Sequence, residues 1–513
     1  MSTGLVIAGA PGVGKTTASR ALAEQLGWPC VDLDALVRAR VGRSPAEIIS
    51  SDGEARFRVF EAEALEGLGA EPAVIALGGG TLTTPKARKL ARELGPVVGL
   101  ELDRDTLLNR IRGDSGAPRP LLVDGLDQLL EARAGTYAAV DRRVSAHGSA
   151  EEVARRIRDA TRDLRMSRAR FLELESRIMV GRGLRSAVVG AVANLEPTRP
   201  ILFIEDLGVP ASKRDALAES LSPLARVTRY ATDGGEACKT WEKAGEILAH
   251  ALSEGCGRQS VVVVLGGGAT CDLGNLVAHL LGRGAPTVLV PSTLLSQVDA
   301  SVGGKCAVNH AGQRNSVGAF HAPAEVVIDL DLLDSLDPDE LRSGLAEMVK
   351  AGVIGAPDLF ERLEAGETPS PDLVSAAVIQ KAGVVARDPL EAGERKHLNL
   401  GHTLGHALEA ASGFGLRHGD AVAMGLAAAA RASAQLGHCA PEVAQRIIAL
   451  LEQLGLPTRA APELLEGARS HFSADKKADA RSLEWIVVRR IGEVAGMRET
   501  SEEVGARLVE LGG

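Results

Sequence analysis

The stretch LVIAGAPGVGKT, residues 5–16, decides the fold class of the first part of the chain. Residues 5–8 are a short apolar run, typical of a buried strand, and a helical pattern of apolar residues follows Thr16. Between them lies the spacing G-x-x-x-x-G-K-T, whose glycines let backbone N–H groups close around phosphate oxygens. Lys15 would neutralise the β and γ phosphates, and the Thr16 hydroxyl would bind Mg²⁺. The sequence therefore predicts a P-loop domain of α/β class.

An incidental glycine turn is the alternative to a phosphate-binding loop. The strand before the loop and the helix after it disfavour this alternative, because that context aims the N–H groups at a phosphate. The residues expected to contact ATP here are Gly12, Val13, Gly14, Lys15, Thr16 and Thr17.

Further motifs follow the loop in a fixed order. A predicted strand at residues 30–33 places Asp32 and Asp34 at its end, where α/β folds bind ligands, and alternation predicts that both carboxylates point to one side. Arg58 in ARFRVFEAEAL and the glycine run at residues 78–80 come next. With the P-loop, these motifs resemble shikimate kinase across residues 1–160, a compact domain with a parallel sheet and flanking helices.

The resemblance implies specific roles. Shikimate would be held by Asp34, Arg58, Gly80 and Arg133. Asp32 would assist Thr16 at the Mg²⁺ site, and Arg119, in a predicted lid at residues 112–122, would reach the ATP phosphates. Residues 133–137 read RAGTY where the family usually has R-N-P-L-Y, so the proline that would stiffen the loop of Arg133 is missing.

Length and composition indicate a multidomain globular protein. Its 513 residues exceed what one hydrophobic core usually serves, and 45% of them are hydrophobic. The net charge of -9 argues against nucleic acid or an anionic membrane as partner, since either favours a basic surface. The six cysteines include no C-x-x-C pair, which is typical of reduced thiols. Without a leader or a membrane-spanning run, we expect a cytoplasmic protein acting on small molecules.

A charged stretch at residues 151–175, EEVARRIRDATRDLRMSRARFLELE, separates the two halves. It contains neither Pro nor Gly, so it predicts the last helix of the first domain continuing into a helical linker at residues 161–175. Beyond it, apolar strands alternate with helices, and the strand at residues 261–265 runs into Gly266, Gly267 and Gly268. A glycine run after a buried strand indicates a dinucleotide or phosphate turn, although the spacing is not G-x-G-x-x-G.

Three histidines crowd into NLGHTLGHALEAASGFGLRHGD, residues 399–420. His402 and His406 are four apart on a helical pattern, so their imidazoles project from one face, with Glu409 one turn further on. His418 follows a glycine-punctuated turn that could bring it back as a third nitrogen ligand. Histidines bonded to core carbonyls are the alternative, but three in one segment favour a metal or proton-transfer site.

The second half resembles 3-dehydroquinate synthase from residue 176 to the end. PSTLLSQVDASVGGKCAVN (residues 291–309), GLAEMVK (344–350) and the histidine segment carry the resemblance. It implies a Rossmann-like NAD domain at residues 176–335 and a mostly helical metal- and substrate-binding domain at residues 336–513. The implied NAD contacts are Asp233, Glu236, Lys239, Gly268, Ala269, Thr270, Cys271, Asp272, Ser292, Thr293, Lys305, Arg314, Leu332, Leu333, Asp334 and Ser335.

The resemblance also reassigns the histidines. Zinc or cobalt would be held by Glu347, His402 and His418, and His406 would become a substrate or proton-transfer residue. The implied catalytic residues are His406, Lys305, Asp299 and Lys350, with Lys15 in the kinase half. The implied substrate contacts of the synthase are Arg314, Asn315, Lys350, Lys381, Arg395, Asn399, His406 and Lys476, or Lys477 in place of the last.

The implied protein is a bifunctional enzyme of the shikimate pathway, and it would assemble as a homo-oligomer through its synthase half. It would phosphorylate shikimate with ATP, and convert 3-deoxy-arabino-heptulosonate 7-phosphate to 3-dehydroquinate and phosphate with bound NAD and a metal. One alternative is a P-loop kinase fused to an NAD- and metal-dependent alcohol or glycerol dehydrogenase. Another is a regulatory protein with a nucleotide sensor and a catalytically inactive second half, which the retained Lys15, Asp34 and Glu347 disfavour.

Overall fold

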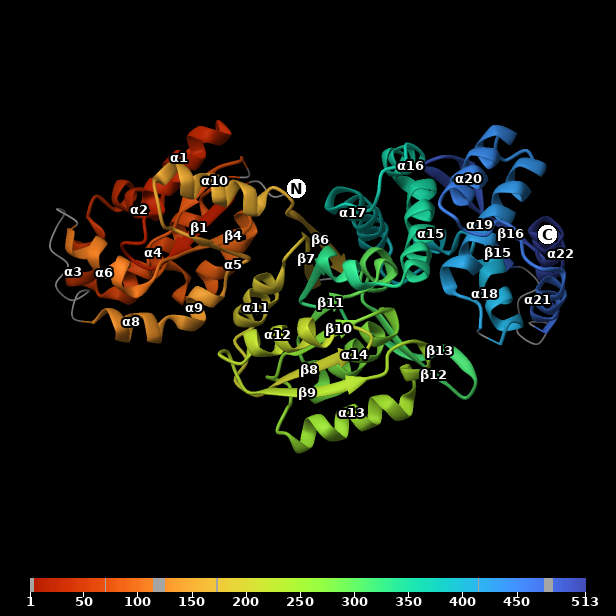
Figure 1. Ribbon diagram of the computed structural model, residues 1–513, viewed down its shortest axis with the longest axis horizontal. Helices are drawn as coiled ribbons and strands as arrows, with labels where there is room; N and C mark the ends of the chain where they lie inside the picture. Colours follow the sequence, from red (N-terminus) through yellow and green to blue (C-terminus); the bar gives the residue numbers. More distant parts are fainter. Residues whose placement is uncertain (1–3, 70, 114–124, 172–173, 414, 475–482) are drawn as a thin grey trace.

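A computed structural model describes residues 4–69, 71–113, 125–171, 174–413, 415–474 and 483–513. Figure 1 shows an α/β body at the N-terminal end, a second α/β body in the middle and a helical body at the C-terminal end. This order confirms the predicted fold class. In the described ranges, none of the helices combines the length and the apolar character needed to cross a lipid bilayer.

The first body is built on a five-stranded parallel sheet in the order β2-β3-β1-β4-β5. Its strands are β1 (Leu5–Gly9), β2 (Cys30–Asp32), β3 (Val74–Ala76), β4 (Val97–Glu101) and β5 (Arg142–Ser145). Successive residues of β1 face opposite sides, as strand geometry requires: Leu5 and Ile7 enter one apolar core, Val6 and Ala8 the other. Helices therefore cover both faces.

Each face of this sheet has its own set of helices. The core that contains Leu5 and Ile7 is closed by α1 (Lys15–Leu26), α6 (Arg104–Gly113), α8 (Leu126–Ala132) and α10 (Ala150–Thr161). The other core is closed by α2 (Leu33–Val41), α3 (Pro45–Asp52), α4 (Glu54–Glu66) and α5 (Pro85–Leu94). The short α9 (Ala134–Ala138) follows α8 at the edge of the body.

The middle body holds a seven-stranded sheet in the order β6-β7-β14-β11-β10-β8-β9, parallel except for the antiparallel pair β6–β7. Its strands are β6 (Arg165–Phe171), β7 (Leu174–Gly181), β8 (Ile201–Asp206), β9 (Val227–Thr232), β10 (Val262–Gly266), β11 (Thr287–Pro291) and β14 (Glu325–Asp329). Helices α11 (Arg185–Asn194) and α12 (Ala211–Leu221) cover one face, and α13 (Trp241–Ser253) and α14 (Gly268–Leu280) the other. The hairpin of β12 (Lys305–His310) and β13 (Gln313–Phe320) extends from this body.

The prediction of a helical linker at residues 161–175 is wrong. Helix α10 ends at Thr161, and β6 begins at Arg165 and pairs along its length with β7. Ala169 and Phe171 are buried two residues apart, which is strand periodicity. The charged composition favoured a helix, but pairing with the sheet and burial of alternate side chains override that local preference.

The C-terminal body is mostly helical and shares an apolar core with the middle body. Its helices are α15 (Pro338–Gly355), α16 (Pro357–Glu364), α17 (Pro371–Arg387), α18 (His402–Ala411), α19 (His418–Gln435), α20 (Pro441–Gln453), α21 (Pro462–Ala474) and α22 (Ser501–Gly512), with a hairpin of β15 (Leu483–Arg490) and β16 (Glu493–Glu499). Leu202 of β8, Val349 of α15 and Val422 of α19 belong to one core cluster. Helix α19, which begins at His418, therefore shares the core of the sheet domain, whereas Leu404 and Leu408 of α18 belong to a separate cluster within the C-terminal body.

Candidate active sites

The phosphate-binding loop connects β1 to α1 in the conformation that its glycines predict. Gly12 and Gly14 lie in the left-handed region, with φ of 81° and 99°, which a residue with a side chain rarely adopts. Lys15 Nζ donates hydrogen bonds of 2.9 Å to the carbonyl oxygens of Gly9 and Ala10. The loop thus holds the ammonium against itself, ready to exchange carbonyl partners for phosphate oxygens.

Asp32 and Asp34 do not lie on one strand, so the alternation prediction is wrong. Strand β2 ends at Asp32, which caps α2 by accepting a 3.0 Å hydrogen bond from Ala35 N and also accepts one of 2.7 Å from Thr16 Oγ1. Asp34 lies in the first turn of α2. Its carboxylate is close to Gly78, since a Cβ added to that glycine would be 2.9 Å from Asp34 Oδ1. Aspartate is a preferred N-cap, which explains the early helix start. Asp32 thus lies beside the P-loop and Asp34 beside the glycine run.

Two guanidinium groups converge on Gly80. A Cβ on Gly80 would be 2.1 Å from Arg58 Nη2 of α4 and 3.0 Å from Arg133 Nη1, so a larger residue here would push the guanidinium groups out of these positions. Glu54 pairs with both arginines, and Arg133 Nη1 also donates a 3.1 Å hydrogen bond to Gly79 O. These bonds fix Arg133 without the proline that the family loop usually has. Paired guanidinium groups form a site for a planar carboxylate.

Sequence reasoning missed Glu61 and Tyr137 at this site. Glu61 is fully buried and accepts hydrogen bonds of 2.6 Å from Arg58 Nη1 and 2.5 Å from Thr81 Oγ1. Burial raises the pKa of Glu61 even though Arg58 opposes that shift. Tyr137 donates a 2.9 Å hydrogen bond to Gly79 O. The available signal was the spacing of Arg58 and Glu61, three residues apart on one helix.

Arg110 of α6 is a third missed residue of the kinase half. Its Nη1 donates a 3.1 Å hydrogen bond to Val13 O in the P-loop, and its Nη2 donates one of 3.0 Å to Ala146 O. The sequence analysis assigned the nucleotide-contacting arginine to Arg119 instead. Arg119 and the centre of the predicted lid lie outside the described residues, so that assignment stays a prediction. Arg110 joins the P-loop to the end of β5.

Three candidate metal ligands from three helices come together in the second half. Glu347 of α15, His402 of α18 and His418 of α19 offer ligand atoms that all lie within 4.8 Å of one another. The Nε2 atoms of His402 and His418 are 3.6 Å and 3.5 Å from Glu347 Oε1. Both Glu347 oxygens are buried: Oε2 pairs with the Lys350 ammonium, while Oε1 faces the two imidazole nitrogens without a well-formed hydrogen bond from a described residue. A buried carboxylate oxygen that faces two imidazole nitrogens fits a cation at this position.

The other ring nitrogen of each histidine already has a partner. His402 Nδ1 lies 3.2 Å from Leu400 O, and His418 Nδ1 lies 3.3 Å from Glu409 Oε1. Carbonyl and carboxylate oxygens only accept, so each Nδ1 carries a proton. Burial disfavours a charged His418, but hydrogen bonds with Glu347 and Glu409 outweigh it and raise the pKa of His418 to about 9, so a metal would have to displace a proton from its Nε2. Burial and the Lys350 ammonium lower the pKa of His402 to about 3, which keeps it neutral. The donor set therefore fits Zn²⁺ or Co²⁺.

Glu409 connects this centre to the middle body. Its buried carboxylate lies between His418 and Arg314, whose Nη1 is 2.9 Å from Glu409 Oε1. Burial favours the neutral form of Glu409, but His418 and then Arg314 outweigh it and lower the pKa to about 2. Arg314 also pairs at 3.2 Å with Glu236 of the predicted NAD set. Arg314 thus bridges two carboxylates, and its role as a phosphate ligand stays a prediction.

We expect Glu409→Gln to lower the affinity for Zn²⁺ by roughly 10- to 100-fold, because loss of the carboxylate charge lowers the basicity of the His418 ring that it orients. A chelator competition titration of the purified full-length chain measures the effect. Glu442→Gln on the exposed surface of α20 is the matched control. Unchanged affinity in Glu409→Gln would show that the carboxylate does not tune the centre.

Two lysines and an aspartate lie next to the metal ligands. Lys350 Nζ pairs with Glu347 and lies 3.9 Å from Asp299 Oδ1, while Lys381 Nζ is 2.8 Å from that same oxygen and 2.6 Å from Asp299 O. His406, one turn after His402, has its ring centroid 5.1 Å from that of His402. The structure therefore brings these predicted synthase residues into one cluster.

A second group of predicted substrate residues gathers around the turn before β12. Lys305 Nζ lies 2.5 Å from Glu391 Oε2, and Asn399 Nδ2 donates a 3.3 Å hydrogen bond to Glu391 Oε1. Arg395 is buried and donates a 3.0 Å hydrogen bond to Gly303 O. Glu391, which has a left-handed φ of 62°, was missed because its role depends on a loop conformation that the sequence does not reveal. Lys476 and Lys477 lie outside the described residues.

The predicted NAD residues follow neighbouring strands at one edge of the seven-stranded sheet. The glycine turn follows β10, Ser292 and Thr293 follow β11, residues 332–335 follow β14, and Asp233, Glu236 and Lys239 follow β9. The carboxyl ends of parallel strands form the ligand-binding edge of such sheets. Lys239 Nζ lies 2.5 Å from Asp272 Oδ2, which ties the β9 and β10 segments together.

Asp206, at the end of β8, was missed in this part of the site. Its Oδ2 accepts hydrogen bonds of 2.8 Å from Thr270 Oγ1 and 3.4 Å from Gly267 N. A Cβ on Gly266 would lie 2.8 Å from Asp206 Cβ, so the turn passes too close to Asp206 for a larger residue. An acidic residue at the end of the neighbouring strand was the only available signal.

The two sites define a P-loop kinase joined to an enzyme with a Rossmann-like domain and a metal centre. Three family models match the chain: Shikimate kinase over residues 11–162, 3-dehydroquinate synthase N-terminal over 229–343 and 3-dehydroquinate synthase C-terminal over 344–478. A curated 3-dehydroquinate synthase from Paracoccus denitrificans is 38% identical over 333 residues, 61% of this chain and 90% of that one. The chain belongs to the 3-dehydroquinate synthase family and carries a shikimate kinase domain ahead of the synthase.

Other relatives agree with that assignment. A 3-dehydroquinate synthase from Neisseria meningitidis is 40% identical and covers 54% of this chain and 79% of its own. The solved structure of 2-epi-5-epi-valiolone synthase from Streptomyces hygroscopicus, with NAD⁺ and Zn²⁺ bound, is 25% identical with a TM-score of 0.58, covering 67% of this chain and 98% of that one. A 2-deoxy-scyllo-inosose synthase complexed with carbaglucose-6-phosphate, NAD⁺ and Co²⁺ shares the fold, with a TM-score of 0.61, 24% identity and coverage of 67% and 99%.

The chain is thus a fused enzyme of aromatic biosynthesis with a kinase half and a synthase half. Its substrates are small molecules, as for both families. A dehydrogenase in the second half is less well supported, because the family models and the curated relatives are those of the synthase.

Proposed function

We propose that the two halves use the residues assembled above for shikimate phosphorylation and for dehydroquinate formation. The observation that carries the kinase assignment is the contact between its two subsites. A Cβ on Gly79 would lie 2.6 Å from Pro11 Cγ of the P-loop, and Gly80 beside it meets Arg58 and Arg133. An acid bound by these arginines would therefore lie directly beside the loop that holds ATP, as transfer of a phosphoryl group requires.

In the kinase half, the protein contributes positioning and charge. Arg58 and Arg133 would hold the shikimate carboxylate, and Asp34 would accept hydrogen bonds from its hydroxyls. Lys15 would neutralise charge that develops on the phosphates, while Thr16 and Asp32 would hold Mg²⁺. The placement of these groups supports the proposal, because Asp34, Arg58 and Arg133 all lie against the glycine run at residues 78–80.

We expect Arg58→Met to raise the KM for shikimate by roughly 10²-fold with little change in the KM for ATP, because a charge-assisted pair with the carboxylate is lost. Steady-state kinetics with each substrate varied in turn measures the split. Arg56→Met on the same helix, where Arg56 lies over Phe60, is the control. Equal losses for both substrates would contradict a specific role at the carboxylate.

In the synthase half, Glu347, His402 and His418 would hold Zn²⁺ or Co²⁺, and the carboxyl edge of the seven-stranded sheet would hold NAD. The solved relatives contain these groups, and the donor set here fits them. When bound, the metal supplies Lewis acidity and NAD supplies reversible hydride transfer. Lys350 and Lys381 would pair with anionic groups of the substrate, and Asp299 would orient both ammonium groups. His406 would exchange a proton with the substrate at its ring nitrogen.

The test is an assay of the full chain with heptulosonate phosphate, Zn²⁺ or Co²⁺, and NAD⁺ at a concentration far below that of the substrate. We expect phosphate release to exceed the NAD⁺ supplied many times over, because a synthase returns the hydride within one turnover. Phosphate release limited to the NAD⁺ supplied, with NADH accumulating, would indicate a dehydrogenase and overturn the proposal.

We further propose that the protein is cytoplasmic, forms a homo-oligomer through the synthase half, and has functional divisions at residues 1–160, 176–335 and 336–513. Exposed apolar side chains such as Leu280 and Phe320 in the synthase half support the assembly, since a second copy could cover them. Light scattering coupled to size exclusion measures the assembly, and a monomer at all concentrations would contradict it.

A further inference from the structure

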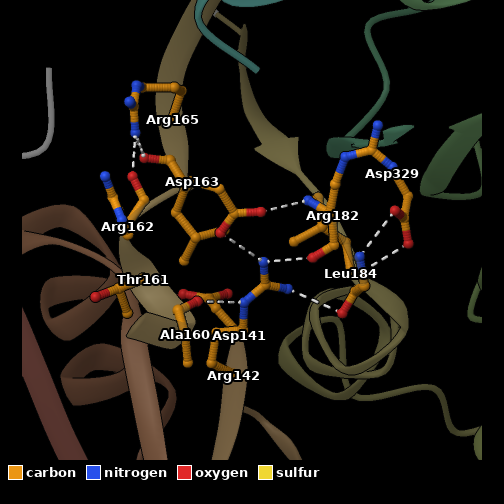
Figure 2. Close-up of polar contacts among 12 residues, drawn as sticks. Asp141, Arg142, Ala160, Thr161, Arg162, Asp163, Arg165, Arg182, Leu184 and Asp329 are labelled. Atoms are coloured by element: carbon orange, nitrogen blue, oxygen red, sulfur yellow. Dashed lines mark hydrogen bonds and ion pairs between the residues drawn. The ribbon is translucent and has the colours of Figure 1, made fainter. Parts of the chain in front are cut away.

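The joint between the two halves is short and has a fixed geometry. Only residues 162–164 separate the end of α10 from the start of β6. Figure 2 shows Arg142, at the start of β5, lying across this joint. Its guanidinium donates hydrogen bonds of 2.9 Å to Ala160 O in the kinase half, and of 2.6 Å and 2.9 Å to Arg182 O and Gly183 O in the synthase half.

Two aspartates hold the synthase side of the joint in place (Figure 2). Asp163 accepts a 2.8 Å hydrogen bond from Arg182 N, and Asp329 accepts bonds of 3.0 Å and 2.7 Å from Gly183 N and Leu184 N. The segment between β7 and α11 is thus fixed to β14 on one side and to the joint on the other. A freely moving tether would not use its backbone groups in this way.

Behind the joint lies a ring of four charges, which we name the interface cluster: Arg92 and Asp141 from the kinase half, Arg177 and Glu325 from the synthase half. Arg177 lies 2.7 Å from both Asp141 Oδ2 and Glu325 Oε1. Arg92 lies 3.2 Å from Asp141 Oδ1 and 2.5 Å from Glu325 Oε2. The Asp141 side chain is fully buried, and the other three are at most 12% exposed. Each charge therefore meets a partner from the other half.

Close backbone approach surrounds the interface cluster. A Cβ on Gly190 of α11 would lie 2.5 Å from Val140 O of the kinase half, so only glycine fits at this position of the helix. Ser186 Oγ donates a 2.9 Å hydrogen bond to Asp141 O. Ala138 of α9 belongs to the same apolar core cluster as Val188 of α11. Backbone, hydroxyl and apolar groups of the two halves thus meet around the interface cluster, as in a permanent interface, with cavities at its margins lined by Arg92, Arg177 and Glu325 and by Arg142 and Gly183.

The charge balance of the interface cluster depends on both halves being docked. Burial favours the neutral form of Asp141, but Arg177 and Arg92 outweigh it and lower its pKa. Losing one arginine would leave two buried carboxylates facing a single cation, an arrangement that is far less stable than the complete ring. Docking of the two halves in another orientation would likewise leave buried charges without their opposite partners. The ring thus favours one relative orientation of the halves.

We propose that the kinase and synthase halves form one cooperative folding unit, joined through a built interface whose specificity comes from Arg92, Asp141, Arg177 and Glu325. The synthase surface formed by β7, β14 and α11 is a docking face for the kinase half of the same chain. The fusion therefore fixes an assembly rather than tethering two independent enzymes.

The test is hydrogen exchange of the full-length chain, followed by mass spectrometry at increasing urea. We expect the slowest amides of β1 and β4 and those of β10 and β11 to open with the same urea dependence, because both sheets unfold in one step. In Arg177→Met, opening of the kinase strands is expected to become at least roughly 10²-fold faster than opening of the synthase strands. Arg226→Met, which removes an exposed pair with Glu254, should leave the two sheets coupled.

Two results would overturn the proposal. One is wild-type protein whose two sheets open at different urea concentrations, since that shows independent halves. The other is Arg177→Met with the sheets still opening together, since that places the coupling outside the interface cluster. If Arg177→Met does not fold, Glu325→Gln, which keeps the shape of the ring, replaces it and should give the same separation.

Discussion

His402→Ala is expected to remove the bound metal and to lower synthase turnover by at least about 10³-fold, while shikimate phosphorylation stays within twofold of wild type. One of three candidate protein ligands would be lost, and Glu347 and His418 alone would hold a divalent metal far more weakly. The kinase half is spared because its residues and those of the metal centre come from different bodies of the molecule (Figure 1).

Metal content by mass spectrometry is the readout that separates loss of the metal from loss of some other function. His438→Ala is the matched control, because His438 lies in the same helical body and contacts Met497 and Arg489 rather than the metal ligands. A His402→Ala protein that keeps stoichiometric Zn²⁺ would contradict the assignment. Loss of both activities in a folded protein would contradict the separation of the two sites.

The sequence predicted best those features that local spacing determines. The P-loop depends on glycines and a lysine within eight residues, and the structure shows it with the expected left-handed glycines. Strand and helix patterns predicted the two α/β bodies, and the family resemblance predicted the helical body that follows them. From spacing alone, His402 and His406 suggested a ligand pair, whereas Glu347, far away in the sequence, completes the cluster with His402 and His418. That correction came from family resemblance, because helical spacing does not reveal contacts between distant helices.

The features that were missed depend on tertiary contacts. Spacing placed Glu409 on the histidine face, but its contacts with His418 and with Arg314, from a hairpin of another body, were not predicted. Asp206 is defined by Thr270 on the neighbouring segment. The segment after α10 was predicted as a helix from its charge pattern, but it forms strand β6 because it pairs with β7. In each case the deciding interaction joins residues that are far apart in the sequence.

The interface geometry also bears on how the two reactions relate. The kinase half meets the synthase half through the amino ends of its strands: Asp141 directly precedes β5, and its Oδ2 accepts a 2.8 Å hydrogen bond from Val97 N at the start of β4. The P-loop follows the carboxyl end of β1, which is parallel to β4, and so lies at the opposite edge of that sheet. The halves can therefore share stability without sharing substrates, and direct transfer between their sites is not expected.

Lys15→Met is expected to lower kcat/KM for shikimate phosphorylation on the order of 10³-fold, about 4 kcal/mol of transition-state stabilisation. The Lys15 ammonium is held by two carbonyl oxygens at 2.9 Å and would move onto the phosphates, where negative charge is greatest during transfer. Methionine keeps the length of the side chain but removes its charge, so loop packing should survive. Lys89→Met on the exposed surface of α5 is the control.

Because the P-loop lies away from the interface cluster, phosphate release by the synthase and the urea dependence of hydrogen exchange should both match wild type. Kinase activity within tenfold of wild type would show that the ammonium does not act on the phosphates, and a simultaneous loss of synthase activity would show that the P-loop and the synthase site are coupled after all.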